Sequence, residues 1–296
     1  MAQIHHFDHG WITPTVSYVL SVLGSMLGLT CAVRLRAARG RGERIWWLVL
    51  AAISIGGTAI WSMHFVAMMG FSVVGTQIRY DIGLTVASAI IAVVAVGIGV
   101  AIAAFGKGHL NVRILIGGII AGLGVAAMHY TGMAAMELNG DVSYSLTRVG
   151  LSIGIAVVAA TVALWLSVTV QKPLVIFFSA LVMGVAVNGM HFTGMSAMSV
   201  MEHDPTGTLR GASATGMIVP IGLGVVFALI GLVYALMAAP NDEDRAAAAY
   251  LAARREAAAD GALDQRTGEF GTIRPPAERG GPTLGGNWTY RDRSSR

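Results

Sequence analysis

The sequence predicts an all-α membrane protein, a bundle of seven transmembrane helices built from three internal two-helix repeats. Three observations predict it: few charged residues, seven long apolar stretches and one motif that recurs three times. Only 12% of the 296 residues are charged, 55% are hydrophobic, and the mean hydropathy is +0.67. Because a soluble domain carries about 25% charged residues, this composition indicates the membrane class.

Seven apolar stretches account for the predicted spans. A span needs about 20 apolar residues to cross a bilayer. The stretches that meet this length without Lys, Arg, Asp or Glu are residues 14–33, 46–70, 82–105, 114–136, 149–170, 174–198 and 217–239. Four parts follow along the chain: an extracytoplasmic segment (1–13), the membrane domain (14–240), a cytoplasmic Ala-rich helix (241–260) and a disordered cytoplasmic tail (261–296).

Basic residues in the short loops predict the orientation of the bundle. Eight lie on one side, namely Arg34, Arg36, Arg39, Arg41, Arg44, Lys107, Arg113 and Lys172, and three lie on the other, namely Arg79, Arg148 and Arg210. Cytoplasmic loops carry the excess of Lys and Arg. We therefore expect the N-terminus outside and the C-terminus in the cytoplasm. The small net charge of +4 gives no sign of nucleic-acid binding.

Pairs of glycines four residues apart occur in several spans. The pairs are Gly24/Gly28, Gly118/Gly122 and Gly150/Gly154. Small residues at this spacing let two helix backbones approach closely inside a membrane. All three pairs are predicted to be helix-packing positions.

The recurring motif contains a histidine in each of three gap-free copies. The histidines are His64, His129 and His191, which stand 65 and 62 residues apart. Each repeat therefore holds about two spans, and the motif falls in spans two, four and six, which run in the same direction. At 1.5 Å per residue, each histidine lies roughly 22–28 Å from the inner end of its span, near the outer face.

Methionine accompanies each histidine at positions −1, +4 and +7. Eight of the nine positions are Met, namely Met63, Met68, Met128, Met133, Met136, Met190, Met195 and Met198, and Phe71 takes the ninth. On a helix, positions +4 and +7 share the face of the histidine. We expect a stripe of one imidazole and two thioethers on each helix, with the −1 methionine turned toward a neighbouring helix.

Imidazole and thioether together form a soft donor set. Such a set favours copper, as Cu(I) or Cu(II), over magnesium or calcium. Zinc is usually bound with Cys or carboxylate ligands, and the stripes contain neither. Haem iron is the less favoured alternative. The competing interpretation is structural: histidines that bond between helices and methionines that fill gaps, copied together by internal duplication.

Other residues on the predicted outer side are candidate accessory ligands. These are Tyr130 and Asn188 in the spans, His5, His6 and His9 before the first span, and His203 after the sixth. The N-terminal histidines could pass metal to the helical cluster, or they could form a flexible polar end. Asn188 could orient a neighbouring ligand or bond across helices.

The motif resembles that of a known family. Met128-His129-Tyr130-Thr131 spells the sequence for which the MHYT domain is named, and the resemblance covers about residues 10–240. It implies a multi-pass sensor of the bacterial inner membrane that binds copper and responds to O₂, CO or NO. Many family members are fused to cyclic-di-GMP domains; this chain is similar to the free-standing members, some of which are associated with carbon monoxide utilisation. Phe65 and Phe192 replace the motif tyrosine, which excludes a three-tyrosine site.

Three functional hypotheses follow. The first is a non-enzymatic sensor of a diatomic gas, or of copper or redox status, which signals through a cytoplasmic partner and could act as a homo-oligomer in the lipid bilayer. The second is a copper transport or delivery protein, and the third is a membrane haem or redox protein. No carboxylate lies within a span, which argues against a hydrolytic enzyme.

Overall fold

The computed structural model describes residues 4–5, 10–74, 76–202, 210–238, 246–247 and 250–258. The chain divides into two compact units, Met1–Ala238 and Ala239–Arg296. In the second unit, residues 250–258 form a helix within the range predicted to be an Ala-rich helix. The prediction of disorder for 261–296 lies outside the described residues.

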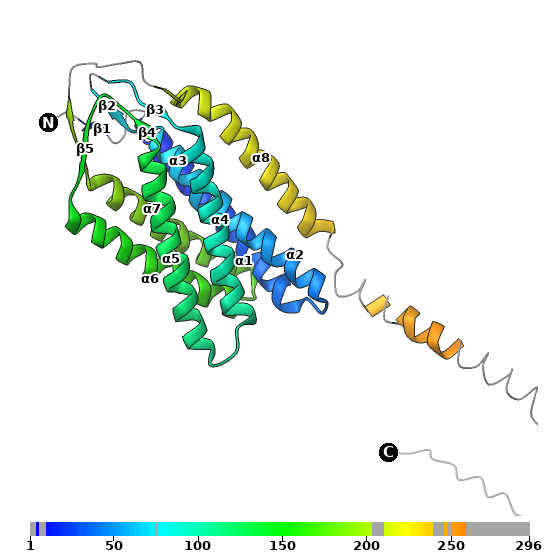
Figure 1. Cartoon of the computed structure of the whole chain (residues 1–296). Coiled ribbons are helices and arrows are strands. Elements are labelled where there is room, and N and C mark those ends of the chain that lie inside the picture. The colour runs from blue at the N-terminus through cyan, green and yellow to red at the C-terminus, as the bar shows by residue number, and fades with distance from the viewer. Residues whose placement is uncertain are drawn as a thin grey trace, which may run out of the picture. The chain divides into compact units, whose positions relative to one another are not determined.

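The predicted all-α bundle with seven spans is confirmed (Figure 1). Within the described residues, seven helices are long and apolar enough to cross a membrane. They are α1 (Ile12–Ala37), the continuous α2–η1–α3 (Arg41–Ala52, Ile53–Ser62, Met63–Met68), α4 (Ile82–Phe105), α5 (Leu110–Ala134), α6 (Leu146–Thr169), α7 (Pro173–Ser196) and α8 (Ala214–Ala238). Helices satisfy their own backbone groups, which hydrocarbon cannot do.

Polar residues and proline begin the helices where the apolar stretches predict them. Asp81 precedes α4, and its carboxylate accepts a hydrogen bond of 2.7 Å from the backbone N–H of Leu84. That bond satisfies one of the free donors at the helix start. Pro173 is the first residue of α7, where its missing N–H costs nothing.

The second span contains a π-helical segment, η1, just before the first histidine. The hydroxyl of Ser62 donates to the carbonyl of Gly57, five residues earlier, at 2.9 Å. A π-helix of ten residues is unusual, because such segments mostly occur as single turns at functional sites. Because a π-helix has wider turns than an α-helix, His64 of α3 points in a different direction from the one it would have in a continuous α-helix.

Two of the three predicted glycine pairs pack helices together. A Cβ on Gly24 would lie 2.5 Å from the backbone nitrogen of Ala59, and one on Gly122 would lie 2.5 Å from Cα of Val157. These glycines let α1 approach η1 and α5 approach α6. The prediction for Gly150/Gly154 is wrong, because a Cβ on either residue of α6 would meet nothing within 4 Å.

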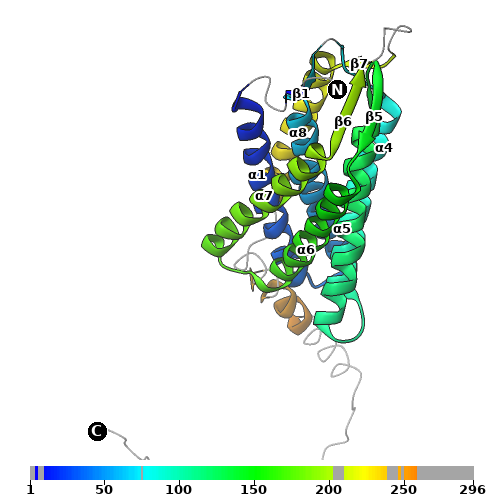
Figure 2. The same ribbon diagram turned by 90° about the vertical axis from the view of Figure 1, so that its left-hand side faces the viewer.

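Short strands close one end of the bundle (Figures 1 and 2). They are β1 (Ile4–His5), β2 (Ser72–Val73), β3 (Arg79–Tyr80), β4 (Met136–Glu137), β5 (Gly140–Tyr144), β6 (Met198–Glu202) and β7 (Ala212–Ser213). All pairs are antiparallel: β1 with β2, β3 with both β4 and β7, and β5 with β6. The connections α1–α2 and α4–α5 lie at the opposite end of the bundle.

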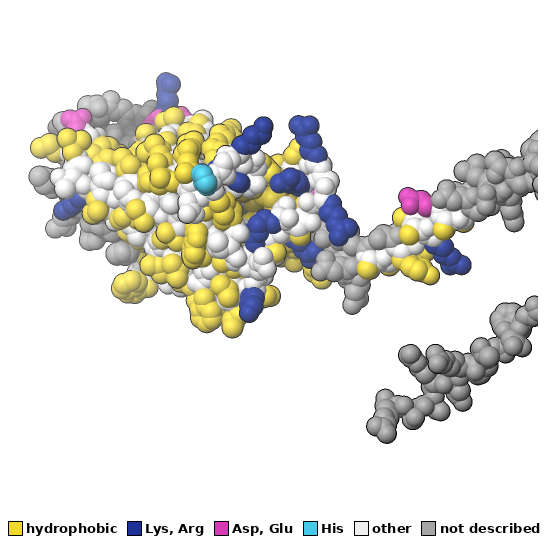
Figure 3. All heavy atoms as spheres, turned by 90° about the horizontal axis from the view of Figure 1, so that it is seen from below, with side chains coloured by type: hydrophobic (Ala, Val, Ile, Leu, Met, Phe, Trp, Pro, Cys, Tyr) yellow, Lys and Arg dark blue, Asp and Glu magenta, His cyan; other side chains and the backbone are white. Residues whose placement is uncertain are grey.

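The surface matches a protein that faces hydrocarbon. Large apolar side chains such as Val158, Val182 and Phe227 are 64%, 59% and 69% exposed. Figure 3 shows one face on which hydrophobic side chains predominate and Lys and Arg gather mainly toward one end. In water, an apolar surface of this extent would mark a binding interface, whereas here it is the expected lipid contact.

Candidate metal centre

Three histidines from three different spans converge in the interior of the bundle. His64 of α3, His129 of α5 and His191 of α7, here called the histidine triad, are 1%, 0% and 1% exposed. The Nδ1 atom of His64 lies 2.9 Å from Nδ1 of His191 and 3.1 Å from Nδ1 of His129. One ligand atom from each ring can be chosen so that all lie within 4.8 Å of one another. The predicted equal height of the three motifs therefore places the side chains at one point.

The three rings stand edge to face around their meeting point. Their centroids are 4.8, 5.0 and 5.2 Å apart, with interplanar angles of 67°, 79° and 89°. This arrangement directs nitrogen atoms, rather than ring faces, toward the centre of the group. Such a convergence of imidazole nitrogens suits a cation.

Two of the three nitrogen separations are close to those that a single metal ion requires. Three imidazole nitrogens at 2.0–2.1 Å from one tetrahedral ion would lie roughly 3.3 Å apart. The observed separations of 2.9 and 3.1 Å are a few tenths of an ångström shorter. A neutral imidazole has one donor and one acceptor nitrogen, so two neighbours compete for the single Nδ1 of His64. A cation would satisfy all three lone pairs at once.

Two glycines form seats for the histidine rings. A Cβ on Gly132 of α5 would lie 3.0 Å from Cδ2 of His64, and one on Gly194 of α7 would lie 2.8 Å from Cδ2 of His129. Both would be closer still to the Nε2 atoms, which are buried and have no hydrogen-bond partner. Each glycine stands three residues after the histidine of its own repeat and supports the histidine of the preceding repeat. The equivalent position in the first copy is Ala67.

Sequence reasoning missed these two glycines as parts of the site. The signal was present, since both later copies contain Gly three residues after His. What the repeat could not reveal is that the glycine of one helix contacts the ring of another. The glycines position the rings and donate no ligand atom.

The +4 methionines lie beside one another in the buried core at the strand end. Met68, Met133 and Met195 are 0%, 1% and 2% exposed and belong to one apolar cluster. We call these three, together with Met136 and Met198 of the same cluster, the methionine layer. The thioethers of three repeats thus gather as the common register predicts.

The prediction that the +7 residues share a helix face with the histidines is wrong. Helices α5 and α7 end at Ala134 and Ser196, so Met136 and Met198 lie in strands β4 and β6. The chain turns back over the end of the bundle, and both side chains still reach the same cluster. Phe71, the +7 residue of the first copy, joins them there.

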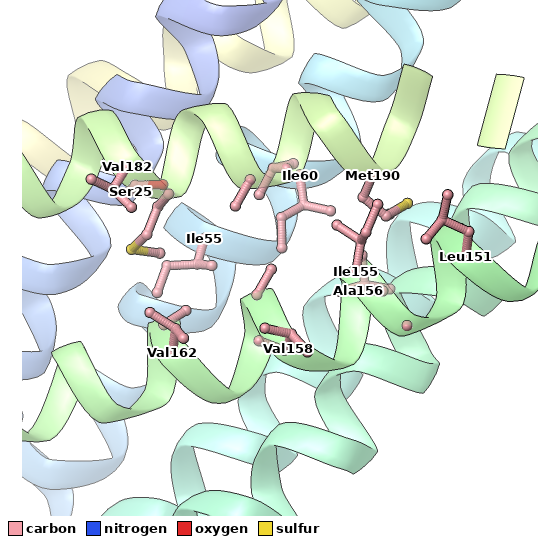
Figure 4. A pocket seen from close by; sticks show the side chains of 18 of the residues that line it. Ser25, Ile55, Ile60, Leu151, Ile155, Ala156, Val158, Val162, Val182 and Met190 are labelled. Carbon is pink, nitrogen blue, oxygen red and sulfur yellow. The ribbon is translucent and has the colours of Figure 1, made fainter. Parts of the chain in front are cut away.

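The −1 methionines occupy different surroundings. Met63, Met128 and Met190 are 1%, 1% and 2% exposed, and among the described residues they do not belong to the cluster of the methionine layer. Met190 instead lines a cavity beside α6 (Figure 4). This separation agrees with the rotation of about 140° between positions −1 and +4 on an α-helix.

Two accessory candidates in the spans bond to other helices. The hydroxyl of Tyr130 lies 2.6 Å from Oγ of Ser152 on α6, while its ring packs edge to face on His129 at 5.0 Å. The Asn188 amide donates to Oγ of Ser21 at 2.8 Å and accepts from Oγ of Ser17 at 3.0 Å. The hydrogen bond of Tyr130 thus links α5 to α6, and those of Asn188 link α7 to α1.

The remaining accessory candidates lie at the edge of the described chain. The backbone of His5 pairs with Ser72 in the β1–β2 ladder, and its side chain lies outside the described part. His6, His9 and His203 lie outside the described residues. Their predicted role stays a prediction.

Comparison with protein-family models identifies the repeats. The model for the MHYT repeat, described as a bacterial signalling protein N-terminal repeat, matches residues 57–118, 122–180 and 184–252. The three matches include His64, His129 and His191 in turn and together cover more than half of the 296 residues. No solved structure matches the chain.

Curated relatives are considerably longer proteins. The chain is 38% identical over 206 residues to the bifunctional diguanylate cyclase/cyclic di-GMP phosphodiesterase MucR of Pseudomonas aeruginosa, a match that covers 68% of this chain and 29% of MucR. It is 34% identical over 168 residues to the cyclic di-GMP phosphodiesterase NbdA of the same species, with 55% and 21% covered. It is 30% identical over 208 residues to the signaling protein YkoW of Bacillus subtilis, with 65% and 24% covered. The matches thus span about a quarter of the length of these relatives.

Proposed function

Because the chain belongs to the MHYT family of bacterial membrane signalling proteins, we propose that it is a sensor that binds copper at the histidine triad. The observation that carries the proposal is the convergence of three buried Nδ1 atoms from three repeats. An ionisable side chain inside a membrane is expensive and marks a functional site by default. Three such side chains at one point strengthen that inference.

Copper is the metal that the surroundings favour. The group of candidate ligands consists of three imidazoles, and no Cys, Asp or Glu joins it among the described residues. The methionine layer supplies thioethers from the same three repeats on the strand side. Thioether and imidazole suit Cu(I), whereas structural zinc sites usually have four ligands that include Cys or carboxylate. When bound there, copper would supply a coordination position for a diatomic gas such as O₂, CO or NO.

The signalling role is proposed from the relatives and from the helices that carry the triad. Two of the relatives are enzymes of cyclic di-GMP metabolism by name. In this chain we propose that ligand binding shifts α3, α5 and α7 relative to one another and that a cytoplasmic partner reads the change. The basic loops favour an orientation with the strand end outside. The buried polar residues of the described chain include no carboxylate, which favours a sensor over a hydrolytic enzyme.

Metal analysis of the purified protein tests the proposal. We expect about one copper per chain in the wild type, and at least ~tenfold less in His64→Ala, His129→Ala or His191→Ala, because each removes a direct ligand. His109→Ala is the matched control, since His109 is exposed and precedes α5 outside the triad. Wild-type copper content in all three triad variants would contradict the copper site.

Two further measurements separate the alternative functions. A Soret band in the optical spectrum of the purified protein would identify a haem protein instead of a copper sensor. Copper uptake into proteoliposomes would support transport or delivery. A change in the infrared or optical spectrum of the copper-loaded protein on addition of carbon monoxide would support gas sensing.

A further inference from the structure

The histidine triad is closed on its strand side. The three +4 methionines are at most 2% exposed, and Tyr80 of β3, packed in the same cluster, is also 2% exposed. The imidazoles themselves are at most 1% exposed. A ligand that arrives from the strand end would have to displace several buried side chains, so another route to the triad would cost less.

An apolar cavity of about 550 Å³ lies beside α6 and α7 (Figure 4). Side chains from α6 and α7 point into it, and residues of α1, η1 and α5 complete its wall. The one polar side chain in the lining is that of Ser25, whose buried Oγ has no hydrogen-bond partner. Ser25 lies at the end of the cavity opposite Met190 in Figure 4.

Glycines of α6 leave this space empty. Gly150 and Gly154 both line the cavity, and a Cβ on either would meet nothing within 4 Å. Among the other lining residues, Leu151, Val158 and Val182 are 58%, 64% and 59% exposed. The cavity therefore extends to the side of the bundle that lipid hydrocarbon would cover, between α6 and α7.

The end of the cavity near Met190 lies about one helical turn from the triad. Ile60, Val125 and Val187 line it, and each stands four residues before one of the three histidines. In the α-helices α5 and α7, residues four apart lie on the same face, one above the other, and Ile60 is the residue of η1 at the equivalent position of the first repeat. Met190, directly before His191, also lines the cavity. The three repeats thus contribute equivalent apolar residues to a layer between the cavity and the metal centre.

We propose that this cavity is the route by which a diatomic gas passes from the bilayer to the histidine triad, an inference that rests on the proposed gas-sensing function. The class of ligand follows from the lining. Sites for larger ligands place several polar groups to fix orientation, whereas this cavity offers one hydroxyl at its far end. Apolar cavities bind small apolar gases such as xenon and stay dry. A gas molecule that dissolves in hydrocarbon needs no polar contact on this path.

Cavity-filling variants test the route. Gly154→Leu and Ala186→Leu fill it from opposite walls, on α6 and α7. Gly222→Leu on α8 is the matched control, because a Cβ there meets nothing within 4 Å and Gly222 does not line this cavity. The readouts are the rates of carbon monoxide binding to and release from the copper-loaded, reduced protein, its copper content, and xenon binding followed by the ¹²⁹Xe resonance.

The expected result is that both cavity variants slow carbon monoxide association and release by at least ~tenfold, with equilibrium affinity and copper content unchanged. Xenon binding should be lost in these variants and kept in Gly222→Leu. Wild-type exchange rates in both variants would overturn the route, as would a phospholipid acyl chain that stays in the wild-type cavity and excludes xenon. A copper-loaded wild type that takes up xenon but binds no carbon monoxide would refute the proposed gas sensing, and the route would fall with it. Carbon monoxide binding with unchanged rates in the cavity variants would refute the route alone.

Discussion

Gly132 and Gly194, which lie against the rings of His64 and His129, give a direct test of the metal centre. Gly132→Ala and Gly194→Ala each add one methyl group against a buried imidazole. The new Cβ would lie 3.0 Å from Cδ2 of His64 or 2.8 Å from Cδ2 of His129, and nearer to Nε2, whereas ordinary contact begins at 3.4 Å. To restore that contact at Nε2, the ring must retreat by roughly 1 Å.

A retreat of this size is large compared with the tolerance of a metal site. Metal–ligand distances hold to within about 0.2 Å, so a displaced imidazole would lose its bond to the ion. We therefore expect copper affinity to fall by at least ~tenfold, as for other changes in the residues that orient ligands. Overpacking should also destabilise the protein by about 1–3 kcal/mol, partly offset by up to about 1 kcal/mol of helix propensity gained by replacing Gly.

The assay is competition for copper against a chromophoric Cu(I) chelator, together with thermal unfolding in detergent. Gly189→Ala is the matched control on α7, because a Cβ at that position meets nothing within 4 Å. It should bind copper as the wild type does and gain slightly in stability. Wild-type copper affinity in both Gly132→Ala and Gly194→Ala would refute the assignment of these glycines as seats for ligating rings.

Three other predictions address the surroundings of the triad. Met133→Leu should keep the fold, since Leu has a similar volume, yet lower the retention of Cu(I) measured by chelator competition; unchanged retention would remove Met133 from the ligand set. Asn188→Ala should lower stability by about 1–2 kcal/mol in thermal unfolding with copper content unchanged, because two bonds to α1 are lost; lost copper would instead make Asn188 part of the site. Burial raises the pKa of the Tyr80 phenol in β3. Above pH ~10 the phenol of Tyr80 ionises in the unfolded chain but stays neutral in the folded protein, so the free energy of unfolding should fall as the pH rises. Tyr80→Phe should make that fall less steep.

Because the protein spans a membrane, the number and positions of its helices can be predicted from the sequence. Each span must be a helix of about 20 apolar residues, so local composition is enough to count and place the spans. Internal repetition adds the register, because equal offsets in parallel helices put the three histidines at one height. The choice of His64, His129 and His191 as a group therefore required no knowledge of how the helices pack.

Packing against other helices could not be predicted in the same way. Gly122 and Gly154 belong to identical small-xxx-small patterns, yet Gly122 touches Val157 and Gly154 faces an open cavity. The spacing from His129 predicts a helical Met136, but Met136 lies in strand β4 because helix α5 ends at Ala134. A sequence shows which residues share a face, but the partner of that face depends on all the other helices.

The sequence by itself determined the seven spans, the three repeats and the shared level of the histidines, since these follow from composition and periodicity along single helices. Only the tertiary structure decided that the Nδ1 atoms converge, that Gly132 and Gly194 support the rings of neighbouring repeats, and that Gly150 and Gly154 open a cavity toward the triad. The physical reason is that these features are contacts between helices. Each depends on the rotation and distance of two helices, which neither helix specifies alone.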